Sequence, residues 1–110
     1  MGAAPVRVLF AEFFIRPVFR VNAEPGLALD PAGKILYFAD SETSSVRALA
    51  FGPDPHVRTL IGTGLFDFGD ANGAFARSRL QHPLGLCWWQ YGLVVADSYN
   101  GRLRRLDLSA

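Results

Sequence analysis

The chain has 110 residues, of which 50% are hydrophobic and 13% aromatic, so its composition is that of a folded domain and excludes general disorder. Eleven basic and ten acidic residues give a formal net charge of +1, which provides no electrostatic signature for binding nucleic acid or an anionic membrane. The single cysteine, Cys87, excludes an intramolecular disulfide and suits a reducing compartment, of which the cytoplasm is the favoured one.

Residues 1–24 contain many apolar side chains, but charged residues interrupt them. A secretory signal needs an unbroken apolar run of about 7–15 residues, and a membrane span needs about 20. Arg7, Glu12, Arg16 and Arg20 break the run in this segment. We therefore expect neither a targeting signal nor a membrane span, and we assign no structure to residues 1–24.

Residues 25–61 are expected to form a blade of four short strands. We expect these strands at residues 27–29, 35–39, 45–49 and 56–61. Each stretch is short, apolar and suited to a half-buried pleated surface. The sequences PAGK (residues 31–34) and GPDP (residues 52–55) supply turns, because proline fixes φ and glycine accepts positive φ.

A long loop is expected at residues 62–81. Its first twelve residues, GTGLFDFGDANG, contain four glycines, which indicate a shaped irregular segment. Leu65, Phe66 and Phe68 are expected to act as its apolar anchors, and residues 74–80 to form a short helical turn.

Residues 82–110 repeat the pattern of residues 25–61. GLCW at 85–88 repeats GLAL at 26–29, and LVVADS at 93–98 repeats LYFADS at 36–41. Asp40 and Asp97 lie 57 residues apart, as do Val46 and Leu103. The repeat predicts an all-β fold, a partial β-propeller of about two four-stranded antiparallel blades. The second blade is expected to be incomplete, because the chain ends after its third strand.

Two motifs resemble a known family. LYFADS (residues 36–41) and LVVADSYN (residues 93–100) resemble the LYVADSxN core of NHL repeats, and HPLGL (residues 82–86) resembles the entry to the next blade. The sequence GLFDFGD (residues 64–70) followed by LQHPLG (residues 80–85) is similar to the propeller of proteins that join a thioredoxin-like domain to NHL repeats. The resemblance covers about residues 25–108.

The resemblance implies a β-propeller ring, of which two blades are a part. A single blade cannot bury its apolar face alone, and stable arrays need roughly three or more repeats. We therefore expect a protein partner, either the rest of a propeller or a second copy of the chain. No Cys-x-x-Cys motif is present in the sequence, so no redox role is carried over to its residues.

Six residues are predicted to have structural roles in turns and at repeat positions: Asp40, Asp97, Asn100, Gly26, Gly85 and Pro83. The two aspartates end corresponding strands, where they could be metal ligands of a propeller channel or acceptors for backbone N–H groups of the following turn. We favour the second role, because Asn100-Gly101 is a strong signal for a tight turn between strands.

The remaining candidates for chemistry are weak. His56 and His82 lack the spacing of a zinc-ligand set. Cys87 lies within a predicted strand, where cysteine behaves as a small hydrophobic side chain rather than a nucleophile. We therefore predict no catalytic residue, no cofactor and no metal.

Arginines and tryptophans near the C-terminus have structural interpretations as well. Arg104 and Arg105 are neighbours on a predicted strand, so they point to opposite faces and do not form a nucleic-acid patch together with Arg102. We expect these arginines to be solvated or paired. Trp88 and Trp89 are expected to divide between the core and the face where the next blade packs.

The sequence thus predicts a non-catalytic binding or scaffold module. Two alternatives stay open: a fragment of a metal-dependent propeller lyase or lactonase, and the accessory propeller of a thioredoxin-like redox protein.

Overall fold

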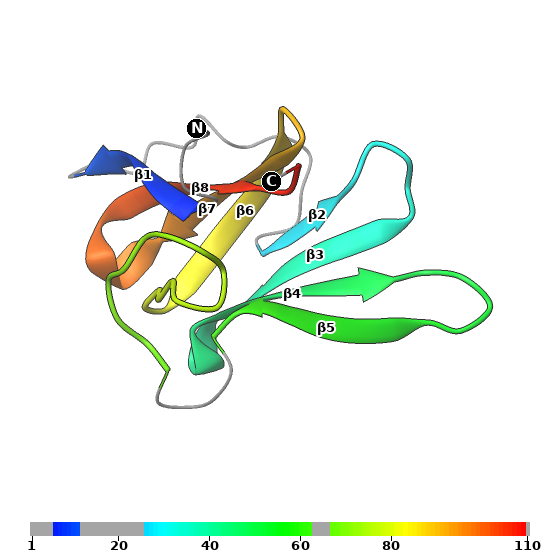
Figure 1. Cartoon of the computed structure of the whole chain (residues 1–110), viewed down its shortest axis with the longest axis horizontal. Coiled ribbons are helices and arrows are strands. Elements are labelled where there is room, and N and C mark those ends of the chain that lie inside the picture. Colours follow the sequence, from blue (N-terminus) through cyan, green and yellow to red (C-terminus); the bar gives the residue numbers. More distant parts are fainter. Residues whose placement is uncertain (1–5, 12–25, 63–66, 110) are drawn as a thin grey trace.

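The computed structural model of the chain describes residues 6–11, 26–62 and 67–109, and for residues 7–11 it describes the backbone only. These residues form two four-stranded antiparallel sheets (Figure 1). The only helical elements among them are two three-residue 3-10 turns, so the predicted all-β class is confirmed and the arrangement is that of a partial propeller. None of the described residues belongs to a helix long and apolar enough to cross a membrane.

The first sheet contains the four strands of the first repeat in sequence order. They are β2 (Leu27–Leu29), β3 (Ile35–Asp40), β4 (Ser45–Ala50) and β5 (His56–Ile61). Each strand lies within one residue of its predicted bounds. Gly33 has a φ of +70° in the β2–β3 turn, and its N–H donates to Asp30 O at 2.9 Å, so the predicted turn chemistry is confirmed.

The second sheet has the strand order β1-β8-β7-β6. The second repeat supplies β6 (Pro83–Trp89), β7 (Gly92–Asp97) and β8 (Arg102–Asp107). The fourth strand, β1 (Val6–Ala11), comes from the other end of the chain and pairs antiparallel with β8. This blade was expected to be incomplete, yet within the described residues it has four strands. Sequence periodicity does not reveal a pairing between segments so far apart.

Each repeat has a 3-10 turn between its second and third strands. In the first sheet the 3-10 turn η1 (Ser41–Thr43) ends at Ser44, whose φ is +53°. In the second sheet η2 (Ser98–Asn100) ends at Gly101, whose φ is +63°. The tight turn expected at Asn100-Gly101 is therefore present as a 3-10 turn closed by glycine.

One hydrophobic core lies between the two sheets. Its buried members from the first sheet are Ala28, Tyr37, Val46, Ala48 and Ile61, and those from the second are Leu86, Leu93, Val95, Leu106 and Val6. The rings of Tyr37 and Trp88 meet across the sheets, with centroids 6.0 Å apart. Trp89, on the opposite face of β6, is 45% exposed, which confirms the predicted division of the tryptophans.

The sheets pack head to tail, with different faces in contact. On the first sheet the contact face carries Tyr37, whose counterpart 57 residues later is Val94, on the other face of the second sheet. The contact face of the second sheet carries Leu93, whose counterpart is Leu36, on the outer face of the first sheet. Each repeat therefore has two different faces. The contact between these two blades uses the Tyr37 face of the first sheet and the Leu93 face of the second.

The inter-repeat loop, residues 67–82, connects the sheets. Its expected helical turn is a single turn, in which Arg77 N and Ser78 N donate to Ala74 O at 3.0 and 2.9 Å. Leu80 is fully buried in the core, whereas Phe68 is 49% exposed and is not a buried anchor. The predicted anchors Leu65 and Phe66 lie outside the described residues.

Candidate functional site

The best-buried polar cluster lies on the second sheet, where an arginine from β8 meets an aspartate from the end of β7. Arg104 Nε donates to Asp97 Oδ2 at 2.7 Å, and both side chains are completely buried. The register explains the contact, because Arg104 lies opposite Val95, two positions before Asp97 on β7. A pair buried this deeply is costly unless hydrogen bonds satisfy its remaining atoms.

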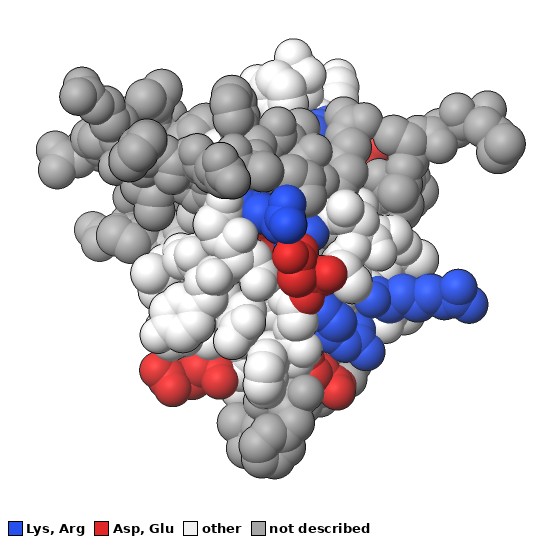
Figure 2. Space-filling view, turned by 90° about the vertical axis from the view of Figure 1, so that its left-hand side faces the viewer, with Lys and Arg blue, Asp and Glu red and all other residues white. Residues whose placement is uncertain are grey.

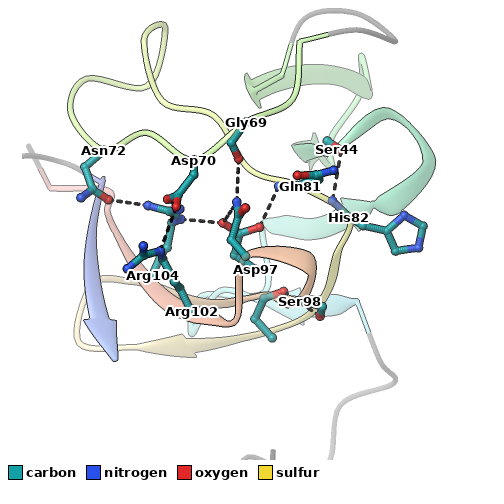
Figure 3. Close-up of polar contacts among 12 residues, drawn as sticks. Ser44, Gly69, Asp70, Asn72, Gln81, His82, Asp97, Ser98, Arg102 and Arg104 are labelled. Carbon is teal, nitrogen blue, oxygen red and sulfur yellow. Dashed lines mark hydrogen bonds and ion pairs between the residues drawn. The ribbon is translucent and has the colours of Figure 1, made fainter. Parts of the chain in front are cut away.

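The inter-repeat loop supplies these hydrogen bonds to the guanidinium (Figure 3). Arg104 Nη1 donates to Asn72 Oδ1 at 2.6 Å, and Nη2 forms a hydrogen-bonded ion pair with Asp70. Arg102 Nε donates to the other oxygen of Asp70 at 3.1 Å. The hydrogen bond from Arg104 is the largest influence on Asp70 and, with Arg102, holds the pKa of its carboxyl below the usual value, although burial opposes this.

The carboxylate of Asp97 is bound to the same loop. Its Oδ1 accepts the backbone N–H of Gln81 at 2.7 Å, and its Oδ2 accepts a hydrogen bond from Asn100 Nδ2 at 2.8 Å. Asn100 Nδ2 also donates to Gly69 O at 2.6 Å. Asp97 thus accepts a backbone N–H, but from the loop that precedes the blade and not from the turn that follows it.

This cluster fastens a loop and has no vacant acceptor at its centre. Within the described part of the chain, no buried side-chain nitrogen or oxygen lacks a hydrogen-bond partner. Both oxygens of Asp97 are engaged, and its charge is balanced by Arg104. We call Asp97, Arg104, Asp70, Asn72 and Asn100 the loop clamp.

The corresponding pair in the first repeat is Asp40 and Arg47, which has a different environment. Arg47 Nη2 lies 3.3 Å from Asp40 Oδ2, and the two side chains are 28% and 36% exposed. Arg47 Nη1 donates to Thr59 Oγ1 at 2.9 Å, and Nη2 donates to Thr43 Oγ1 at 3.3 Å. These contacts come from β5 and from the η1 turn of the same repeat, so among the described residues this pair does not bind the inter-repeat loop.

The two histidines are not brought together as ligands. The His82 ring stacks on Tyr99 with centroids 4.4 Å apart, and the His82 backbone N–H donates to Ser44 Oγ at 3.1 Å. His56 is exposed, with Nδ1 hydrogen-bonded to Asp54 O at 3.0 Å. Over residues 6–11, 26–62 and 67–109, no group of three or more His, Cys, Asp or Glu side chains is placed to hold a metal ion.

The remaining candidates have packing roles in the structure. Cys87 is half-buried on β6, and burial raises the pKa of its thiol, which opposes nucleophilic reactivity. Arg105 is buried on the face of the second sheet opposite Arg104, with its guanidinium 5.4 Å from the Trp89 ring centroid. It is thus stacked on an aromatic ring rather than solvated.

Charge on the surface is mixed. On the face that Figure 2 shows, described basic and acidic side chains lie next to one another, and no broad area carries a single sign.

The other predicted repeat residues lie at close approaches or irregular points of the backbone. Gly26, with a φ of +83°, lies close to Leu84, since a Cβ there would be 3.3 Å from Leu84 O. Pro83 and Gly85 lie on β6 beside a bulge in its pairing with β7.

Curated relatives carry the same kind of repeat. NHL repeat-containing protein 2 of Bos taurus is 43% identical over 95 residues, which are 77% of this chain and 13% of that protein. Protein SUPPRESSOR OF QUENCHING 1, chloroplastic, of Arabidopsis thaliana is 42% identical over 96 residues, which are 77% of this chain and 9% of that protein. The chain is an NHL-repeat protein.

NHL repeat-containing protein 2 of Homo sapiens is 40% identical over 88 residues, or 74% of this NHL-repeat chain and 12% of that protein. The chain therefore spans about a tenth of the length of the curated relatives that it matches. No family model matches it. The resemblance predicted from the two ADS motifs is confirmed by these relatives.

Proposed function

We propose that the chain is a non-catalytic binding segment of an NHL β-propeller, whose first sheet receives a neighbouring blade on its outer face. The observation that carries this proposal is the head-to-tail packing of the two sheets. The second sheet contributes Leu93, Val95 and Leu106 to the core that it shares with the first. Their counterparts on the first sheet are Leu36, Phe38 and Leu49, all on the outer face.

The outer face of the first sheet is apolar over all four strands. Leu29 on β2 and Val57 on β5 are 51% and 54% exposed, and the register aligns Leu29 with Leu36, Leu36 with Leu49, and Leu49 with Val57. A continuous apolar face of this kind marks an interaction surface in a soluble protein. The same side-chain positions in the second repeat are already covered by a blade, so the chemistry fits a blade as the partner.

The loop clamp supports a structural rather than a catalytic role for the most prominent charged residues. Asp97 was, with Asp40, one of two aspartates weighed as channel ligands, and its oxygens bind Gln81 N, Asn100 and Arg104. A carboxylate with three such partners has no oxygen directed at a substrate. Its proposed function is to hold the loop against the blade.

Cysteine labelling in the cells that make the protein tests the proposal. Leu29→Cys places a thiol on the outer face, and Ala32→Cys places a matched thiol in the neighbouring exposed β2–β3 turn. We expect a maleimide to modify Ala32→Cys rapidly and Leu29→Cys slowly in the native protein, and both rapidly after denaturation. The chain without an introduced cysteine measures the background labelling of Cys87. Equal, rapid modification of both variants in the native protein would contradict the proposal.

A further inference from the structure

The loop clamp has an incomplete counterpart in the first repeat. Asp40 and Arg47 lie 57 residues before Asp97 and Arg104, at the same positions of their strands. In both repeats an arginine of the third strand forms an ion pair with the aspartate that ends the second. The two sites therefore have the same recognition chemistry, and their occupants can be compared directly.

In the second repeat the occupant is a short loop with a defined set of groups (Figure 3). Asp70 gives Arg104 a carboxylate, and Asn72 gives it an amide oxygen. Further along, the backbone N–H of Gln81 binds the aspartate of the pair. The loop sequence that carries the first two groups is Gly-Asp-Ala-Asn, at residues 69–72.

In the first repeat the same pair binds only its own repeat among the described residues. Arg47 donates to Thr43 and Thr59, and more than a quarter of its side chain is exposed. Residues 1–24, which precede this repeat as the loop precedes the second, contain no Gly-Asp-x-Asn sequence. The loop that matches this site is therefore not encoded before β2 in this sequence.

We propose that Asp40 and Arg47 bind a Gly-Asp-x-Asn loop of the neighbouring blade. Arg47 receives the loop aspartate and asparagine, and Asp40 accepts a backbone N–H further along the loop. The proposal rests on the proposed function, because the loop arrives with the blade that covers Leu36, Phe38 and Leu49. It adds that the contact is specific for an acidic loop, since an apolar face alone does not fix the partner or its register.

A synthetic peptide of residues 67–82 is the probe, because this segment already binds the equivalent site within the chain. It is titrated into isotope-labelled protein, and the backbone and arginine Nε–H resonances are followed by NMR. We expect saturable shifts at Asp40, Thr43 and Arg47. Peptide with Asp70→Asn is expected to bind about tenfold more weakly, because the guanidinium then loses its charged partner.

Matched protein variants identify the site. Arg47→Gln is expected to abolish the shifts, whereas Arg58→Gln leaves them unchanged. Arg58 is an exposed arginine of β5 that pairs with Ala48, the neighbour of Arg47 on β4. The unperturbed resonances of the second sheet serve to show that both variants are folded.

Three results would overturn the proposal: no shift at millimolar peptide, equal binding to Arg47→Gln, or shifts confined to Arg104 through exchange with the chain's own loop. Rapid labelling of Leu29→Cys together with peptide binding at Arg47 would contradict the blade contact and support only a loop-binding site at Arg47. Slow labelling of Leu29→Cys without peptide binding would support the blade contact and contradict only the loop site.

Discussion

Replacing Asp97 by alanine should destabilise the fold far more than the equivalent change in the first repeat. Asp97→Ala removes the acceptor of three hydrogen bonds, from Gln81 N, Asn100 Nδ2 and Arg104 Nε. Arg104 is completely buried, so its charge is left in the interior with only the loop partners. Asp40→Ala removes one partner of an ion pair that is partly exposed.

The expected magnitudes follow from burial. Breaking a buried ion pair by removing one partner costs about 3–5 kcal/mol, and each buried donor left unsatisfied costs about 1–3 kcal/mol. We therefore expect Asp97→Ala to lower the free energy of unfolding by about 3–5 kcal/mol. A solvent-exposed ion pair contributes about 0–1 kcal/mol, which sets the expected effect of Asp40→Ala.

Urea denaturation followed by tryptophan fluorescence measures both variants, because the partly buried Trp88 packs against the core and lies near Tyr37. Both variants carry the same substitution, aspartate to alanine, at equivalent positions of the two repeats, so each is the control of the other. Losses of unfolding free energy that agree within about 0.5 kcal/mol would show that burial of the clamp does not set its energy.

Three further predictions concern single sites. Tyr91→Gly should raise the free energy of unfolding by about 0.5–1 kcal/mol in thermal or urea melts. Tyr91 has a φ of +61° in a two-residue hairpin turn, which favours glycine, and its side chain is mostly exposed. A loss of stability in this variant would contradict the prediction. Cys87 should react with iodoacetamide much more slowly in the native than in the unfolded chain, by mass spectrometry, because burial raises the pKa of its thiol; equal rates would refute the packing role. The lowered pKa of Asp70 stabilises the fold fully above about pH 4, and this contribution is lost as the pH falls further, so Asp70→Asn should flatten the acid limb of a plot of stability against pH. An unchanged acid limb in that variant would show that Asp70 is not the group responsible.

The strands were predictable because their signals are local. In the first sheet, PAGK separates β2 from β3 and GPDP separates β4 from β5, so these short apolar stretches end or begin near residues that set the backbone. Strand β1 was not predictable in the same way, because its place in the sheet depends on pairing with β8 at the other end of the chain. Nothing in the local pattern of residues 6–11 specifies that partner.

The loop clamp was only partly predictable. Asp97 was expected to accept a backbone N–H, but the donor is Gln81 in the preceding loop. One signal was present in the sequence, because an arginine follows each repeat aspartate by seven residues, as Arg47 follows Asp40. The loop partners Asp70 and Asn72 could not be identified, because a glycine-rich segment has no periodicity that fixes the direction of its side chains.

One NMR measurement tests the head-to-tail packing of the two repeats. If the sheets pack as described, the Tyr37 ring protons give nuclear Overhauser effects to the Trp88 indole, since the ring centroids are 6.0 Å apart. If the sheets instead met through their equivalent faces, Trp88 would contact Phe38, which lies on the outer face beside Leu27. Cross-peaks between Tyr37 and Trp88 would support head-to-tail packing, and cross-peaks between Phe38 and Trp88 in their place would contradict it.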